Sequence, residues 1–108
     1  MYNATIVENS LADTSILKEL EIAKSWQSDD WTLHNVLVKE DQIGLLSKYL
    51  DNGPWYIHLW KEGDDEIKVV FKDKIFYIKH SDKSSWSEAI AYGKSIGIPE
   101  EQLDFIIE

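Results

Sequence analysis

Two segments of the chain repeat a pattern of tryptophan and histidine that could bind a ligand or transfer protons. The pattern occurs at residues 31–34 (WTLH) and again at residues 55–58 (WYIH). In an extended strand, residues three apart point to opposite faces, so neither tryptophan shares a site with its own histidine. Alternation along the second segment instead groups Tyr56, His58 and Trp60 on one face. Aromatic rings with a polar end are typical of ligand platforms and protein interfaces.

His34 joins this group only if its strand lies beside that of His58 in a matching register. We therefore take four residues as candidates for ligand or interface contacts: His34, Tyr56, His58 and Trp60. The alternative is that the N-terminal strand or the acidic segment 103–108 covers this face, and that its rings are ordinary core.

Other kinds of chemistry have weaker support in the sequence. The three histidines lie far apart and the chain has no cysteine, so we expect no metal site and no cofactor. The sequence contains no Gly-x-Ser-x-Gly motif for a nucleophilic serine. A histidine beside a carboxylate could still act as a general acid–base, and His34 and His58 are the candidates for that role.

The composition narrows the classes of partner. The chain has 108 residues, enough for one hydrophobic core, and we expect a single domain over residues 1–108. Its net charge is −9, its cations are all lysines, and no block of the sequence is basic, which argues against nucleic acid. No apolar run is long enough to span a membrane, and residues 1–5 do not resemble a signal peptide. We expect a cytoplasmic protein.

Hydrophobic periodicity and turn residues define the elements that position these side chains. Strands are expected over residues 4–7, 31–39, 55–61, 66–72 and 74–79, and helices over 13–20, 41–51 and 85–97. Residues 21–27 fit either a helix or a strand, and the turn that follows favours a strand. Ser85 and Glu88 have the spacing of a capping box at the start of the last helix.

The resulting order is β-α-β-β-α-β-β-β-α, and short connections make the sheet mainly antiparallel. This order predicts an α+β fold, a two-layer sandwich with the helices on one face of the sheet. Trp55, Ile57 and Leu59 would face the helices, and Tyr56, His58 and Trp60 would lie on the face without helices.

The second half of the chain resembles a group of small conserved-hypothetical proteins of bacteria and archaea. The resemblance covers about residues 55–105. It rests on these segments: residues 55–60 (WYIHLW), 69–76 (VVFKDKIF), 86–93 (WSEAIAYG), 97–99 (GIP) and 101–105 (EQLDF). It implies a free-standing prokaryotic protein and agrees with a cytoplasmic location. It implies no activity and no site residue.

From these observations we expect a non-enzymatic module that binds a small molecule or a protein through the aromatic and histidine face of its sheet. Self-association is the simplest way to bury exposed rings, so a homodimer is one candidate partner. The alternative is a small enzyme in which His58 or His34 acts as general acid–base beside a carboxylate.

Overall fold

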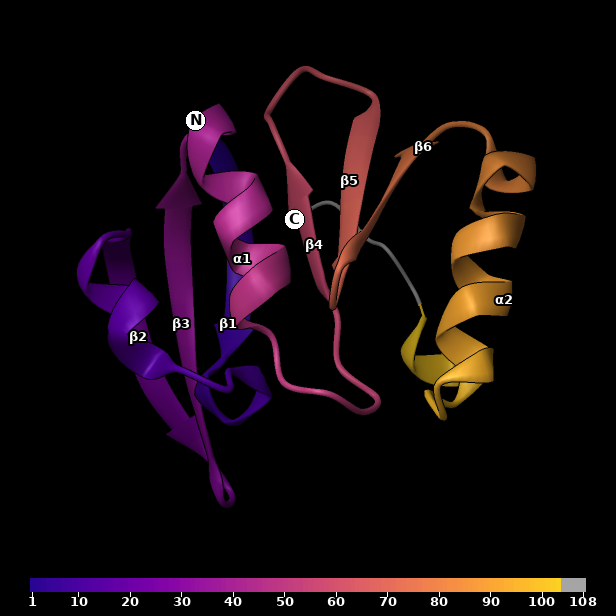
Figure 1. Ribbon diagram of the computed structural model, residues 1–108. Helices are drawn as coiled ribbons and strands as arrows, with labels where there is room; N and C mark the ends of the chain where they lie inside the picture. Colours follow the sequence, from indigo (N-terminus) through magenta and orange to yellow (C-terminus); the bar gives the residue numbers. More distant parts are fainter. Residues whose placement is uncertain (104–108) are drawn as a thin grey trace.

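Six antiparallel strands form one sheet in the computed structural model of the chain, which describes residues 1–103 (Figure 1). In space they lie in the order β2-β3-β1-β4-β5-β6, so the N-terminal strand is central and pairs with both β3 and β4. The strands are β1 (Tyr2–Val7), β2 (Glu21–Ser28), β3 (Trp31–Val38), β4 (Ile57–Trp60), β5 (Glu66–Phe71) and β6 (Lys74–Lys79). The expected α+β class with an antiparallel sheet is confirmed.

The helices of the described residues are short. The two α-helices are α1 (Ile43–Tyr49) and α2 (Ser87–Ser95). The 3-10 helices are η1 (Glu8–Ser10), η2 (Thr14–Lys18), η3 (Glu40–Gln42), η4 (Lys83–Trp86) and η5 (Glu100–Gln102). The first expected helix is thus a 3-10 helix, and residues 21–28 are a strand.

The two faces of the sheet carry separate hydrophobic cores, which we call the first and the second face. On the first face, α1 and η2 pack against alternate residues of five strands: Ala4, Ile6, Val36, Val38, Ile57, Leu59, Val70 and Ile75. On the second face, α2 packs against Ile67, Val69, Phe71, Phe76 and Ile78. Val70 and Phe71 are neighbours on β5 yet belong to different cores, because adjacent strand residues point to opposite faces.

The two α-helices therefore lie on opposite faces, and the expected two-layer sandwich with all helices on one face is wrong. The physical reason lies in β5, where the five residues from Ile67 to Phe71 are buried on both sides of the strand. Val70 on one face of β5, and Ile67, Val69 and Phe71 on the other, are buried apolar residues, so each face needs a covering layer. Figure 1 shows α1 in front of the central strands and α2 beside β6 at the other end of the sheet.

The second face is covered over only part of its width. Within residues 1–103, α2 and the segment that follows it pack on β5 and β6, with Ile98 and Leu103 completing that core. Side chains of β1 and β3 on the same face stay half-buried: Asn3, Thr5, Val7, Leu33, Asn35 and Leu37. We call the part of this face over β1, β2 and β3 the open half.

The entry into α2 differs from the expected capping box. The side chain of Asp82 accepts a hydrogen bond from the backbone N–H of Ser84 and so caps η4, a 3-10 turn that leads into α2. Ser85 lies inside that turn and its hydroxyl donates to the carbonyl of Asp82. Glu88 consequently sits in the first turn of α2, without a capping partnership to Ser85.

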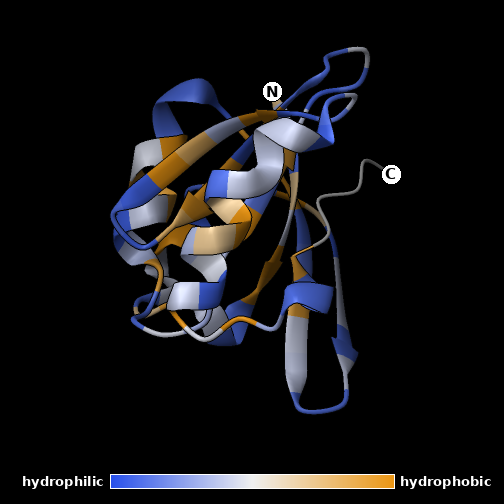
Figure 2. Cartoon of the chain, turned by 90° about the vertical axis from the view of Figure 1, so that its right-hand side faces the viewer, coloured by the Kyte–Doolittle hydropathy of each residue, from blue (hydrophilic) through white to orange (hydrophobic). Residues whose placement is uncertain are grey.

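Hydrophobic residues are concentrated on the strands, and the hairpin loops are hydrophilic (Figure 2). Among residues 1–103, no helix is both long and apolar enough to cross a membrane. The acidic segment 103–108 is the alternative cover for the face that carries the rings. Its residues 104–108 lie outside the described residues.

Candidate functional site

His58 and Trp60 on β4 and Tyr56, just before that strand, form a row of rings on the second face, which we call the aromatic row. The Tyr56 and His58 ring centres are 6.3 Å apart with an interplanar angle of 27°. Those of His58 and Trp60 are 5.3 Å apart at 28°. The prediction that these three side chains share one face is confirmed, because alternate residues of a strand point the same way.

The aromatic row begins inside the second core. The Tyr56 ring lies 6.0 Å from that of Phe71, which in turn contacts Tyr92 of α2 at 4.8 Å. The Tyr56 hydroxyl donates a hydrogen bond to the carbonyl of Gln102 in η5. The face that carries the row is thus the face on which α2 packs, and the expectation that it lacks a helix is wrong.

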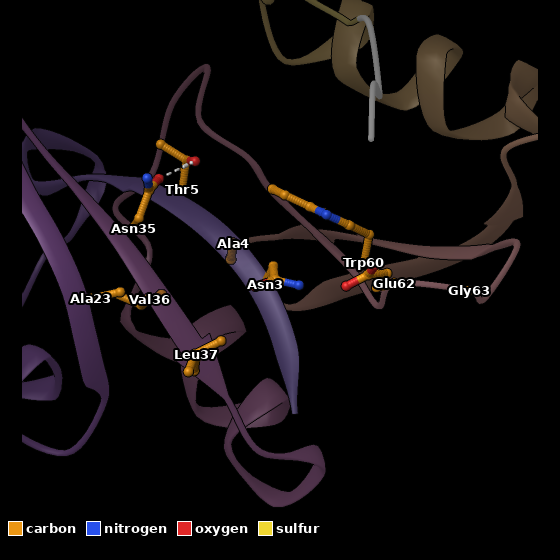
Figure 3. A pocket seen from close by; sticks show the side chains of 10 residues that line it. All are labelled: Asn3, Ala4, Thr5, Ala23, Asn35, Val36, Leu37, Trp60, Glu62 and Gly63. Carbon is orange, nitrogen blue, oxygen red and sulfur yellow. Dashed lines mark hydrogen bonds between the residues drawn. The ribbon is translucent and has the colours of Figure 1, made fainter. Parts of the chain in front are cut away.

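The other end of the row borders the open half. Trp60 is paired with Asn3 of β1, and its ring lines a cleft of about 570 Å³ (Figure 3). Only 9% of the Trp60 surface is exposed, so the ring forms part of a wall and not a free platform. The cleft is lined by Asn3, Ala4, Thr5, Ala23, Asn35, Val36, Leu37, Trp60, Glu62 and Gly63.

The hydroxyl, amide and carboxylate groups of this Trp60 cleft come from two strands, β1 and β3, and one loop. The hydroxyl of Thr5 donates to Oδ1 of Asn35 at 2.8 Å, and this bonded pair lies at the opposite end from Trp60 and Glu62 (Figure 3). Asn3 lies between the two ends. Glu62 is the one charged residue among those that line the cleft. The lining therefore offers hydroxyl, amide and carboxylate groups and no cation.

The sequence reasoning missed Asn3, Thr5 and Asn35 as site residues. Their signal was present in the alternation of β1 and β3, where polar residues share a face opposite the buried Ala4 and Val36. Polar residues on one face of a strand are also typical of a solvent-exposed surface. The sequence alone does not show that β1 pairs with both β3 and β4, which brings these residues together.

His34 does not belong to the aromatic row. It pairs with Ile6, so it lies on the first face, and β1 separates its strand from β4. Its side chain is buried, with 8% of the residue exposed. Nδ1 lies 2.6 Å from Oγ of Ser25 on β2, and Nε2 lies 3.2 Å from Oε1 of Glu8 in η1. His34 thus has a carboxylate beside it, on the face of the sheet opposite the Trp60 cleft.

Three ionisable groups outside the Trp60 cleft have displaced pKa values. Hydrogen bonds from Ser15 lower the pKa of Asp13, and hydrogen bonds from Ser81 lower the pKa of Asp65. Burial opposes the charge of Lys68, but its hydrogen bonds to Glu66 and Tyr2 outweigh that effect and raise its pKa.

Within residues 1–103, no three histidine, cysteine or acidic side chains come together as metal ligands would. Comparison of the chain with known protein families, with curated proteins and with solved structures finds no match. The resemblance of residues 55–105 to small conserved-hypothetical proteins of bacteria and archaea therefore stays a prediction.

Proposed function

We propose that the Trp60 cleft is a non-catalytic binding site, which holds a small, uncharged, hydroxyl-rich molecule. The observation that carries the proposal is the lining of the cleft: neutral hydrogen-bonding side chains, one carboxylate, one indole and no cation. A cleft of about 570 Å³ is of the size that takes a small molecule.

The polar groups favour hydroxyl groups as ligand atoms. Each hydroxyl both donates and accepts, so it can pair with the amide of Asn3, the amide of Asn35 and the carboxylate of Glu62. An anion would meet the carboxylate of Glu62 with no compensating lysine in the lining, on a chain of net charge −9. The indole of Trp60 supplies an apolar wall for the carbon atoms of such a ligand.

The aromatic row supports this proposal by holding the wall in place. His58 stacks against Trp60, Tyr56 stacks against His58, and Tyr56 is anchored to Gln102 and to the second core. A wall held by packed neighbours loses little conformational entropy when a ligand binds. In this proposal Tyr56 and His58 position Trp60, and Trp60 touches the ligand.

The test is a binding screen followed by NMR. A panel of neutral sugars and polyols, organic amines and organic carboxylates is added at millimolar concentration. The signals observed are the indole N–H of Trp60 and the side-chain amides of Asn3 and Asn35. We expect neutral hydroxyl compounds to shift these signals and carboxylates to leave them unchanged. The proposal is wrong if only amines shift them, or if no member of the panel does.

A matched pair of variants then tests the position of the ligand. Asn3→Ala removes one amide from the cleft, and we expect it to weaken binding about tenfold, as the loss of one hydrogen bond would. Asn52→Ala removes an exposed amide from the loop after α1 and is expected to leave the affinity unchanged. Equal effects of the two variants, or a concentration-dependent dimer that covers the open half, would contradict a small-molecule site.

A further inference from the structure

Ser25, His34 and Glu8 form a chain of hydrogen-bonding groups that the Trp60 cleft does not use. Oγ of Ser25 is 2.6 Å from Nδ1 of His34, and Nε2 of His34 is 3.2 Å from Oε1 of Glu8. The three residues come from β2, β3 and η1, and His34 lies on the face opposite the aromatic row. A hydroxyl, an imidazole and a carboxylate in this order are the parts of an activated nucleophile.

The two hydrogen bonds together select one tautomer of neutral His34. A carboxylate can only accept a hydrogen bond, so the ring nitrogen that faces Glu8, Nε2, carries the hydrogen. Nδ1 then holds a lone pair, and the Ser25 hydroxyl donates to it. This arrangement prepares the imidazole to take the proton of Ser25.

The strand pairing places Ser25 where a reagent can reach it. Ser25 is exposed on β2, which is an edge strand, while its partner His34 is buried. Ser28 and Trp31 flank the two-residue hairpin turn and form a hydrogen-bonded pair, and such pairs alternate along an antiparallel ladder. Counting back from the turn, Ser25 and His34 form a non-hydrogen-bonded pair. The backbone N–H of Ser25 consequently points away from β3, towards the open edge of the sheet.

We infer that Ser25 is a nucleophile for acyl transfer from small carboxylic esters, with His34 as its general base and Glu8 as the residue that positions His34. Oγ of Ser25 forms a bond to the ester carbonyl carbon while its proton moves to Nδ1 of His34. The outward N–H of Ser25 can donate to the oxyanion that develops. The C–O bond of the ester then breaks, and the leaving alkoxide takes the proton from His34. Water, deprotonated by His34, attacks the carbonyl carbon of the acyl-serine. The bond from that carbon to Oγ of Ser25 then breaks, Oγ takes the proton back from His34, and the carboxylic acid is released.

The experiment is covalent labelling of the full chain with a fluorophosphonate, which captures an activated serine when the O–P bond forms and fluoride leaves. Peptide mapping by mass spectrometry locates the adduct. We expect one adduct per chain, on Ser25, and hydrolysis of p-nitrophenyl acetate that the same reagent abolishes. Ser28 is a matched internal control, because it is an exposed serine on the same strand that pairs with Trp31 and not with a histidine.

Substitutions test whether Ser25 reacts because His34 activates it or only because it is exposed. Ser25→Ala is expected to remove the adduct and the esterase activity, and Ser28→Ala to leave both unchanged. His34→Gln is expected to slow labelling of Ser25 by about 100-fold or more, the usual loss when a general base is removed. If His34→Gln does not fold, the contrast between Ser25 and Ser28 in the unsubstituted chain still decides. The inference is wrong if the folded chain shows no adduct, or equal labelling of both serines.

The role of Glu8 has its own readout. In the unsubstituted chain, the ring ¹⁵N shifts of His34 should report hydrogen on Nε2. In Glu8→Ala we expect both tautomers to be populated and the labelling rate of Ser25 to fall, with rescue of both by Glu8→Gln, whose carbonyl oxygen can accept the same bond. Unchanged ¹⁵N shifts in Glu8→Ala would show that Glu8 does not position His34. The Trp60 cleft lies on the opposite face, so these variants leave ligand binding there unaltered.

Discussion

The two faces of the sheet differ in how completely they are covered. The first face is closed by α1 and η2 over β1, β3 and β4, and its core reaches β5. The second face is closed by α2 over β5 and β6, and over β1 and β3 it stays half-exposed. The strands that leave the second face open carry polar side chains on it, whereas β5 has buried apolar residues on both faces and is covered on both. The fold thus keeps one part of one sheet face accessible beside two buried cores.

The two Trp-x-x-His segments illustrate the same difference. β3 and β4 both pair antiparallel with β1, so they run in the same direction and bring Trp31 and Trp55 into edge-to-face contact at 5.8 Å. His34 nevertheless faces the first core, and His58 faces the second. Identical spacing has led to two different environments: one histidine between a serine and a carboxylate, and one between two aromatic rings.

The largest expected difference between the covered and open halves of the second face is in the free energy of unfolding. We expect it from truncation of Phe71. Its side chain is fully buried among the rings of Tyr56, Phe76 and Tyr92. Phe71→Ala should lower the free energy of unfolding by about 3–5 kcal/mol, as loss of a core phenylalanine does. Leu37→Ala, on the open half, should lower it by less than about 2 kcal/mol, because that side chain is already partly solvated. Urea unfolding measures both, and equal losses would refute the division of the second face into two halves.

An intermediate effect on stability is expected when a glycine of each α-helix is replaced by alanine, which adds one methyl group. A Cβ at Gly93 of α2 would lie 2.7 Å from Cδ2 of Leu103, so Gly93→Ala crowds the second core. A Cβ at Gly44 of α1 meets nothing within 4 Å. Gly44→Ala should stabilise the protein by about 0.5–1 kcal/mol through helix propensity. Gly93→Ala should destabilise it by about 1 kcal/mol, because overpacking exceeds the same gain. Thermal unfolding of the two variants gives the signs, and a stabilising Gly93→Ala would mean that Leu103 is loosely packed.

The smallest expected effect is on the pH dependence of stability, and it comes from two exposed aspartates, Asp13 and Asp65. Asp13 caps η2 next to the first face, and Asp65 accepts two hydrogen bonds from Ser81 in the turn that leads to α2. Both folded-state pKa values lie below the ordinary value of 3.8 because serine hydrogen bonds favour the carboxylates. The stabilisation is therefore present above pH 3.8 and is lost as the pH falls through the lower folded value.

Carboxyl ¹³C titration by NMR measures these two midpoints. We expect Asp65 in Ser81→Ala, and Asp13 in Ser15→Ala, to titrate closer to 3.8 than in the unsubstituted chain. A midpoint for Asp65 that does not move in Ser81→Ala would mean that Ser81 is not the cause of its low pKa.

Much of the fold was accessible from local patterns. The strand at residues 74–79 was predicted with the bounds it has, and the side chains of Ile57 and Leu59 are buried as their alternation indicated. In the last helix, Trp86, Ala89 and Gly93 are buried and Ile90 is half-buried, at the spacing of one helical face. These features depend on periodicity within one element, which the sequence expresses directly.

The candidate site was predictable only in part. Tyr56, His58 and Trp60 share a face because they alternate along one strand, and no long-range information is needed for that. The Trp60 cleft needs Asn3, Thr5 and Asn35 from two other strands, and the Ser25–His34–Glu8 group needs β2, β3 and η1. Pairings between distant segments set these neighbours, and a shift of register by one residue would exchange the faces.

The sequence by itself determined the α+β class, the antiparallel strands and the alternation that separates core from surface along each strand, because these follow from hydrophobic period and turn residues. Only the tertiary structure decided that α2 packs on the face opposite to α1, that His34 and His58 lie on different faces, and that the open half borders Trp60. These outcomes depend on strand order and on which side of the sheet each helix crosses, and the hydrophobic pattern of β5 is compatible with cover on either side.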